Sequence, residues 1–397
     1  MSFEALGLHP KVQEGIDALG FKEPTPIQQA SIPIIKSGKD LIGSAQTGTG
    51  KTAAFLLPIL DKITRSGDLS TTQCIIVVPT RELAVQIDQQ VQGLSYFANV
   101  HSIAIYGGGD GDSFSQEKKG LTEGAPIIIA TPGRFIAHLT MNYAKLDGVT
   151  HLVLDEADRM LDMGFYHDIM KIISFLPKER QNLLFSATMP PKMRELCRTV
   201  LKDPEEINIA VSVPAEKILQ VGFVVYETQK IPLIEHILTK KSFTSVIVFC
   251  STKDSAKKLF KTLKSKNVNV ADIHSDLAQK DREDVMNQFK AKKLSVLVAT
   301  DILSRGIDIE DIELVINYDV PNDGEDYIHR IGRTARAASK GAAFTFISEK
   351  EQSKFADIES LIGRPLDKAK IPEWLGEAPA YNPSKQNRGR KSYKRKR

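Results

Sequence analysis

Residues 41–52 read LIGSAQTGTGKT, a short apolar run followed by a glycine-rich turn, and a helix-like apolar stretch comes next. Glycines let a backbone approach a phosphate chain closely, so that amide N–H groups surround it. In such a loop Lys51 reaches the β- and γ-phosphates, and Thr52 offers its hydroxyl to Mg²⁺. The stretch therefore predicts a nucleotide-binding P-loop, although Ala45 stands where the first glycine is usual. The residues expected to surround the phosphates are Ala45, Gln46, Thr47, Gly48, Thr49, Gly50, Lys51 and Thr52.

A second motif supplies acids. Residues 152–158 read LVLDEAD, an apolar run that ends in carboxylates. In parallel sheets, ligands bind at the carboxyl ends of the strands. We expect Asp155 to hold Mg²⁺ through water and Glu156 to orient an attacking water. Together with the glycine-rich loop, these acids indicate phosphate chemistry in the first half of the chain.

The apolar runs repeat along the chain. They lie at 74–78, 127–130, 151–154 and 182–185, and similar runs return at 246–249, 296–299 and 314–316. The spacings agree, because 51 residues separate Thr80 from Thr131 and 49 separate Ser251 from Thr300. Fully apolar strands that alternate with helices are typical of parallel sheets covered on both faces. We predict a duplicated α/β domain.

The domain boundaries follow from composition. We predict an amino-terminal domain over 1–210, a linker over 211–217, a second domain over 218–365 and a disordered basic tail over 366–397. Residues 385–397 hold eight Lys and Arg and no acid, which leaves 45 basic and 49 acidic residues elsewhere. A basic tail on a mildly acidic body predicts a polyanionic partner.

Composition also excludes several classes. No apolar run approaches the ~18 residues that span a membrane. The opening residues lack the basic and apolar regions of a secretory signal. The cysteines, Cys74, Cys197 and Cys250, are isolated, which excludes a disulfide scaffold or zinc cluster and predicts a reducing, cytoplasmic location.

The second half has no glycine-lysine loop, but residues 329–336 read HRIGRTAR. Arg333 and Arg336 are three apart, so on a helical turn they share a face. A planar guanidinium suits the charge that develops on a transferring phosphoryl group. We infer that two domains close over one nucleotide.

These residues resemble the DEAD-box ATP-dependent RNA helicases, and the resemblance extends to about residue 360. Residues 155–158 spell the DEAD motif, and residues 20–28 resemble the Q motif, with Phe3 as its upstream aromatic residue. The other motifs follow in family order: PTRELA at 79–84, GG at 107–108, TPGR at 131–134, SAT at 186–188, ATD at 299–301 and SRGID at 304–308. The opening is similar to bacterial RhlE-like members. The family usually has Gly where Ala335 stands, a change that is harmless if the position is helical.

The resemblance implies an α/β protein of two tandem RecA-like domains, each a mostly parallel sheet flanked by helices. It also implies roles for individual residues. Adenosine would contact Phe21, Thr25, Gln28 and Asp308. Catalysis would use Lys51, Glu156, Arg333 and Arg336. Hydrolysis would be coupled to domain closure by Asp158, Ser186, Thr188 and His329. The RNA backbone would meet Arg81, Gly107, Gly108, Thr131, Gly133, Arg134, Thr300 and Arg305.

The implied activity is RNA-stimulated ATP hydrolysis that closes two domains on single-stranded RNA and separates short duplexes locally, or remodels RNA–protein complexes. The implied partners are RNA, ribosome-assembly or RNA-decay proteins and no membrane, and the implied state is a monomer. Three alternative functions remain open, and the first of them would use the same motifs. They are an ATP-gated RNA clamp with little unwinding, a passive RNA chaperone acting through the tail, and a translocating DNA helicase, which the Q motif disfavours.

Overall fold

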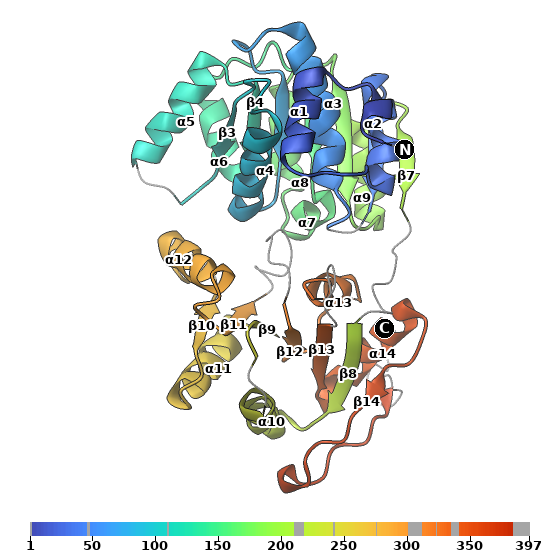
Figure 1. The fold of residues 1–397 in the computed structure, drawn as a ribbon, viewed down its shortest axis with the longest axis vertical. Coiled ribbons are helices and arrows are strands. Elements are labelled where there is room, and N and C mark those ends of the chain that lie inside the picture. Colours follow the sequence, from blue (N-terminus) through green and yellow to red (C-terminus); the bar gives the residue numbers. More distant parts are fainter. Residues whose placement is uncertain are drawn as a thin grey trace, which may run out of the picture. The chain divides into compact units, whose positions relative to one another are not determined.

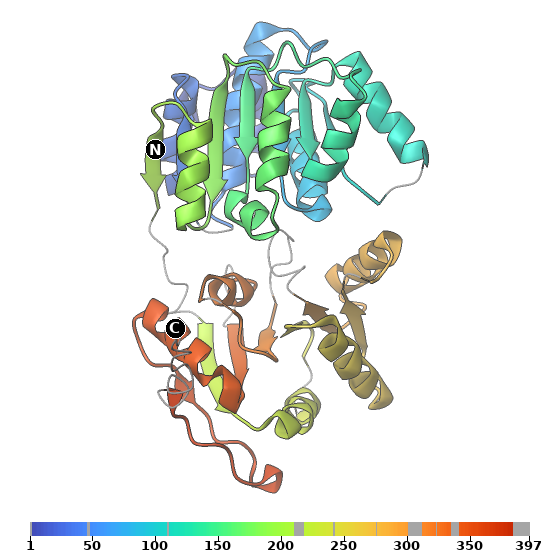
Figure 2. The same ribbon diagram turned by 180° about the vertical axis from the view of Figure 1, so that it is seen from behind.

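The computed structural model describes residues 2–45, 48–108, 111–209, 218–240, 243–274, 276–300, 312–322, 324–334 and 341–383. The chain divides into two compact units, Met1–Val211 and Ser212–Arg397, drawn in Figures 1 and 2. Within the described ranges, every helix is too short or too polar to cross a membrane.

The described strands of the first unit form a seven-stranded parallel sheet in the order β3-β4-β2-β5-β6-β1-β7. Its core strands are fully buried β-branched runs, as the sequence predicts. Ile127 and Ile129 enter one core and Ile128 enters the other, because successive side chains point to opposite faces. The strands are β1 (Leu41–Ser44), β2 (Cys74–Val77), β3 (Ser102–Ile105), β4 (Ile127–Ala130), β5 (His151–Leu154), β6 (Gln181–Ser186) and β7 (Glu205–Asn208).

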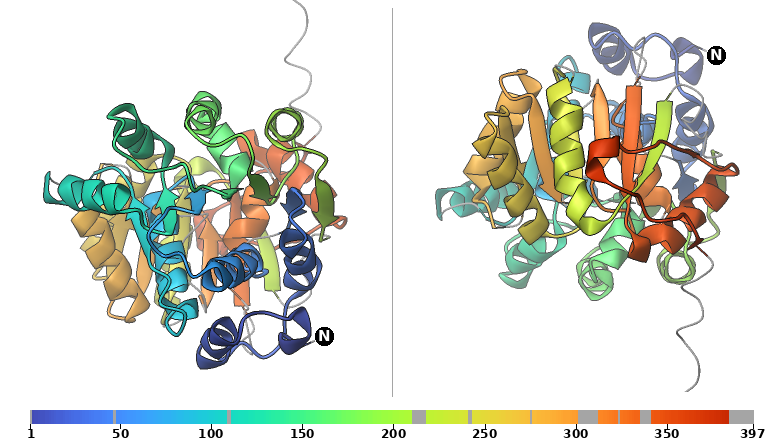
Figure 3. Two further views of the ribbon diagram at one scale, coloured as in Figure 1. Left: turned by 90° about the horizontal axis from the view of Figure 1, so that it is seen from above. Right: turned by 90° about the horizontal axis from the view of Figure 1, so that it is seen from below.

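Helices cover both faces of this sheet. One core contains side chains of α1 (Pro10–Ala18), α2 (Pro26–Lys36), α3 (Lys51–Ser66) and α4 (Arg81–Leu94). The other contains side chains of α5 (Gly111–Glu123), α6 (Pro132–Thr140), α7 (Ala157–Asp162), α8 (Tyr166–Ser174) and α9 (Pro191–Val200). In the left view of Figure 3, which is seen from above, the blue and green helices lie on opposite sides of the first sheet. A short 3₁₀ helix, η1 (Glu4–Leu6), precedes α1.

The described strands of the second unit form another seven-stranded parallel sheet, in the order β10-β11-β9-β12-β13-β8-β14. These strands are β8 (Ile218–Val224), β9 (Val246–Cys250), β10 (Val270–Ile273), β11 (Val296–Thr300), β12 (Leu314–Asn317), β13 (Gly341–Ile347) and β14 (Asp367–Lys368). One face is covered by α10 (Glu227–Lys240) and α11 (Lys253–Ser265), and the other by α12 (Gln279–Lys290), α13 (Gly324–Ile331) and α14 (Gln352–Ile362). Two 3₁₀ helices are η4 (Glu349–Glu351) and η5 (Glu373–Leu375).

The predicted duplication is confirmed by the strand order. The repeated runs become β2 and β9, β4 and β11, and β5 and β12, and each pair takes the same place in its sheet. The connections also match, because Thr80 caps α4 through the Leu83 amide (3.3 Å) and Thr252 caps α11 through the Ser255 amide (3.1 Å). The fold class, tandem RecA-like domains, is therefore confirmed.

The predicted disorder of residues 366–397 is wrong for residues 366–383, which pack on the second unit. After β14 the chain runs past α10 through η5, where Gln229 Nε2 donates to the carbonyls of Leu375 (2.8 Å) and Glu377 (3.0 Å) (Figure 1). The Tyr381 hydroxyl donates to Glu359 at 2.6 Å. Side chains of α10 and α14 hold this segment. Its own sequence contains prolines and has no periodic apolar pattern, so it does not predict this packing. The basic run 385–397 and the predicted linker 211–217 lie outside the described residues.

Candidate functional site

Three adjacent strands bring the phosphate motifs to one edge of the first sheet. β5, β6 and β1 are neighbours, and their registers place Ser44 beside Ser186 and Leu154 beside Leu184. The glycine-rich loop follows β1, the acids 155–158 follow β5, and Ser186 ends β6. We call the residues that follow these strands the β5–β6–β1 edge. Parallel strands bind ligands at their carboxyl ends, so the fold gathers motifs that lie more than 100 residues apart.

The glycine-rich loop turns sharply into α3. Gly48 and Gly50 have φ values of 81° and 89°, a region that glycine adopts without strain. Lys51 is the first residue of α3 and is buried, and its Nζ donates to the Ala45 carbonyl at 2.7 Å. The ammonium therefore lies against the start of the loop that it closes. Gln46 and Thr47 lie outside the described residues.

The amino terminus of α2 packs against the end of this loop. The Gln28 carboxamide accepts from the Thr25 amide (2.9 Å) and donates from Nε2 to the Gly50 carbonyl (3.1 Å). A Cβ at Gly50 would lie 2.4 Å from Gln28 Nε2, so only glycine fits there. These bonds use one acceptor site and one N–H of the carboxamide and leave a second of each for a ligand. Phe21, partly exposed, stacks on Phe3 with ring centroids 6.3 Å apart.

The acids that follow β5 are buried, and Asp155 interacts electrostatically with the lysine of the glycine-rich loop. Burial raises the pKa of Asp155 to about 7, although the Lys51 ammonium opposes this shift. Glu156 has φ 49°, its amide donates to Asp155 Oδ1 (2.9 Å), and its Oε2 lies 3.4 Å from Arg159 Nη1. Among the described residues, no cluster of three His, Cys, Asp or Glu side chains could hold a metal by itself. Thr52 follows Lys51 in the first turn of α3. A carboxylate and a threonine hydroxyl, completed by phosphate oxygens, are the oxygen donors that suit Mg²⁺ in a nucleotide site.

Asp158, Thr188 and Ser186 form one hydrogen-bonded chain. Thr188 Oγ1 donates to Asp158 Oδ2 (3.1 Å), and the Thr188 amide donates to Ser186 Oγ (3.1 Å). Ser186 Oγ in turn donates to the Thr188 carbonyl (2.6 Å). The structure thus brings three of the four predicted coupling residues together, all within the first unit.

The other half of the sheet edge carries the predicted RNA motifs. We call the residues that follow β3, β4 and β2 the β3–β4–β2 edge; these strands are also neighbours. Their carboxyl ends present 107–108, 131–134 and 80–81. A Cβ at Gly107 or Gly133 would meet nothing within 4 Å, and neither glycine has a positive φ, so packing within the described part of the protein does not demand glycine there. A glycine without a side chain at an uncrowded position lets another molecule approach the backbone closely.

In the second unit, Thr300 ends β11, and its buried Oγ1 has no hydrogen-bond partner among the described residues. His329 lies on α13, and Arg333 lies just beyond it. The helix ends at Ile331, so Arg333 lies outside it. The predicted shared face with Arg336 stays a prediction, because Arg336 lies outside the described residues. Residues 333–334 turn back to bond Ile312, whose amide donates to the Arg333 carbonyl at 3.3 Å. Arg305, Asp308, Ala335 and Arg336 lie outside the described residues.

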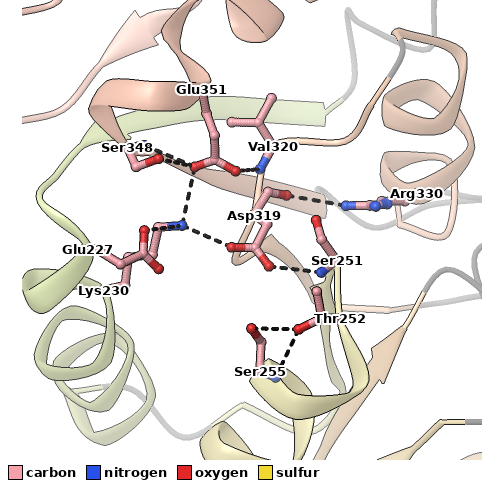
Figure 4. Close-up of polar contacts among 10 residues, drawn as sticks. All are labelled: Glu227, Lys230, Ser251, Thr252, Ser255, Asp319, Val320, Arg330, Ser348 and Glu351. Atoms are coloured by element: carbon pink, nitrogen blue, oxygen red, sulfur yellow. Dashed lines mark hydrogen bonds and ion pairs between the residues drawn. The ribbon is translucent and has the colours of Figure 1, made fainter.

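A buried ion network, absent from the sequence prediction, fixes α13 and its neighbours (Figure 4). Lys230 Nζ, 1% exposed, contacts Asp319 (2.9 Å) and Glu351 (3.2 Å). Asp319 Oδ2 accepts from the Ser251 amide (2.8 Å), and its carbonyl accepts from Arg330 Nη1 (3.4 Å). Burial alone would lower the pKa of Lys230, but the carboxylates of Asp319, Glu351 and Glu227, the last at 3.2 Å, together outweigh burial and raise it. The network therefore ties the carboxyl ends of β9 and β12 to α10 and α13. Asp319 follows β12 much as Asp155 follows β5, a parallel that could have signalled it.

The comparisons with known proteins agree on one family. The chain matches the profile "DEAD/DEAH box helicase" over residues 25–196 and "Helicase conserved C-terminal domain" over 229–338. It is 41% identical to the ATP-dependent RNA helicase CshA of Listeria monocytogenes, over 94% of this chain and 71% of that protein. It is 39% identical to the ATP-dependent RNA helicase DbpA of Bacillus subtilis, over 91% of this chain and 74% of that protein. The solved structure of S. cerevisiae Dbp5 bound to RNA and ADP BeF3 matches with a TM-score of 0.85 at 30% identity, over 94% of this chain and 96% of that one.

Proposed function

Because the chain belongs to the DEAD-box ATP-dependent RNA helicases, we propose that its first unit binds ATP at the β5–β6–β1 edge and RNA at the β3–β4–β2 edge. The protein is an ATP-dependent RNA helicase that hydrolyses ATP to ADP and phosphate. The observation that carries the proposal is the strand order, which sorts the motifs into two groups along one sheet edge. Dbp5 was solved with RNA and a nucleotide together, which supports separate sites.

The adenine lies against Phe21 and the free sites of the Gln28 carboxamide. Since Gln28 also bonds Gly50, base recognition is transmitted directly to the phosphate loop. Loop amides and Lys51 bind the phosphates. Glu156 orients the attacking water and accepts its proton, and Arg159 holds this carboxylate within reach.

Asp155 and Thr52 are the residues that would hold Mg²⁺. The raised pKa of Asp155 reflects a buried carboxylate that the described cations compensate only in part, which fits a divalent cation nearby. When bound, Mg²⁺ neutralises charge on the phosphates.

RNA lies along 80–81, 107–108 and 131–134, and Arg81 and Arg134 bind its phosphates. Gly107 and Gly133 let the backbone approach closely. Contacts of this kind read no sequence, so RNAs of different sequence bind comparably.

The second unit completes the reaction through residues assigned by family resemblance. Arg333 and Arg336 stabilise charge on the phosphoryl group, Asp308 binds the ribose, Thr300 and Arg305 bind RNA, and His329 joins the chain Asp158–Thr188–Ser186. RNA stimulates turnover because it binds better to the state in which both units engage the nucleotide. That state bends one strand and releases its partner, so separation is local.

The test is ATP turnover by the full chain without nucleic acid, with RNA and with DNA, beside strand displacement on a short RNA duplex. RNA stimulation with displacement is expected, and Lys51→Ala abolishes both because ATP binding weakens. RNA retention under ATP without displacement would favour the clamp. Annealing that survives Lys51→Ala would favour the passive chaperone.

We also propose four further properties of this protein. They are the resemblance to the RhlE-like branch, a cytoplasmic location, a monomeric state, and ribosome-assembly or RNA-decay partners. The domain limits 1–210, 211–217, 218–365 and 366–397 stay predictions, except for the packed segment 366–383.

The basic run 385–397 is proposed as an RNA tether. Eight cations that neutralise up to eight phosphates give a log–log salt slope of roughly −6 at most. Deleting 385–397 should weaken RNA affinity and flatten that slope while leaving turnover at saturating RNA nearly unchanged. An unaltered slope in filter-binding titrations would remove the tether.

A further inference from the structure

We propose that Glu117 is a positioning residue for RNA binding: its buried carboxylate fixes Arg134 and the end of β3 in the geometry that receives RNA phosphates. The inference rests on the proposed assignment of the β3–β4–β2 edge to RNA. Glu117 belongs to none of the motifs that suggested this assignment.

The Glu117 carboxylate, 5% exposed, joins three elements. Its Oε2 accepts from Arg134 Nε at 2.7 Å and lies 2.8 Å from His138 Nε2, both on α6. Its Oε1 accepts from the Tyr106 amide at 3.4 Å, immediately before Gly107 and Gly108. One acid on α5 therefore holds the strand end at 106–108 against the helix that carries Arg134.

Aromatic rings complete the arrangement. The Arg134 guanidinium carbon lies 4.7 Å from the centroid of the Phe114 ring, and the His138 ring stacks on the same ring with centroids 4.3 Å apart. The Arg81 guanidinium carbon likewise lies 4.7 Å from the Tyr106 ring centroid. Each guanidinium is held by its face, and Arg134 is also held by its Nε edge. Arg134 Nη2 is buried and has no hydrogen-bond partner among the described residues, so it is a donor that only a group reaching into this site can satisfy. The guanidinium fork suits a phosphate oxygen for that role.

A carboxylate is needed because the neighbours are donors. The Tyr106 amide and Arg134 Nε both direct N–H groups at Glu117, one to each oxygen. A glutamine of the same shape has one acceptor end and one NH₂ end, so it must set a donor against a donor. Glu117→Gln therefore releases either Arg134 or the strand end.

Simple electrostatics predicts the opposite effect of this substitution. Removing a negative charge near a polyanion site strengthens binding if only charge matters. Glu123→Gln is the matched control, because Glu123 is on the same helix, is exposed and pairs only with Lys119 at 3.8 Å among the described residues. Both variants change the net charge equally.

The experiment measures RNA-stimulated ATP turnover of the full chain across an RNA titration. Glu117→Gln should raise the KM for RNA by roughly 5- to 30-fold, as expected for a loss of one or two ordinary interactions, with kcat at saturating RNA near the wild-type value. Glu123→Gln should leave this KM unchanged or lower it. In an Arg134→Ala background, Glu117→Gln should add nothing, because Arg134 is gone and the glutamine oxygen can then accept from the Tyr106 amide and keep the strand end in place.

A second variant guards against misfolding. Phe114→Leu removes the stacking face beneath Arg134 without changing charge and should also raise the KM for RNA. If Glu117→Gln behaves like Glu123→Gln, or if its effect persists without Arg134, the positioning role is overturned. If Arg134→Ala and Arg81→Ala leave the KM for RNA unchanged, the RNA assignment of this edge fails instead.

Discussion

Glu156 combines three local features that decide its chemistry. It follows a buried strand, adopts φ 49° at the start of α7, and has Arg159 three residues ahead at 3.4 Å. The motif predicts the acid, because strand and carboxylate are adjacent in sequence. Arg159 becomes a partner only once the helix begins at Ala157, so its contact could not be predicted from composition.

Replacing this acid tests its role. Glu156→Gln retains the shape but cannot accept a proton, so kcat should fall by roughly 10²- to 10⁴-fold. ATP affinity, measured with a fluorescent nucleotide, should remain near the wild-type value. Hydrolysis at the wild-type rate would exclude Glu156 from catalysis.

His151 makes the stability of the first unit depend on pH. It is buried at the start of β5 beside Lys62, and burial together with that ammonium lowers its pKa to about 3. The pKa of this histidine in the unfolded chain is about 6.5. Below pH 6.5 the unfolded chain therefore binds the proton more strongly than the folded chain does, and the free energy of unfolding decreases as the pH is lowered. The loss at pH 5 is about 2 kcal/mol.

The check is the free energy of unfolding in urea at pH 8 and pH 5, with unfolding monitored by circular dichroism. His151→Gln should lose less stability between these pH values than the wild type. The same change at the exposed His167 is the control and should keep the wild-type pH dependence. Equal pH dependence in all three proteins would refute the assignment.

At the scale of elements, the sequence predicts the strands well, but it predicts poorly where helices end and which side chains of different elements meet. The run 127–130 is apolar and β-branched, and it becomes a strand buried on both faces. The end of α13 was not predictable, because Thr334 Oγ1 bonds the carbonyl of Ile312, which lies 22 residues earlier. The network of Glu117, Tyr106 and Arg134 was missed for the same reason: its members come from three elements and form no motif.

The segment after β14 provides a test at this scale. Gln229→Ala removes the donor from the carbonyls of Leu375 and Glu377, which are partly accessible to water, at a cost of about 0.5–1.5 kcal/mol for each bond. Hydrogen exchange over residues 372–380 should therefore accelerate. Gln288→Ala on α12, at an exposed position, is the control. Unchanged exchange in the Gln229 variant would show that other contacts hold the segment.

At the scale of the molecule, two sheets of one strand order carry different chemistry. The ordered repetition of apolar runs is sufficient to predict both units, because each run keeps its place in its sheet. The glycine-lysine loop occurs in the first unit alone, so the second unit has no such loop to hold a triphosphate of its own. The contribution of the second unit to the triphosphate of the first comes from family resemblance and is the central claim to test.

The most direct measurement is RNA-stimulated ATP turnover by the full chain with Arg333→Ala, beside nucleotide affinity. If a guanidinium of the second unit stabilises the transferring phosphoryl group, kcat should fall by roughly 10³-fold or more while ATP affinity stays near that of the wild type. Turnover by Arg333→Ala at the wild-type, RNA-saturated rate would contradict the account.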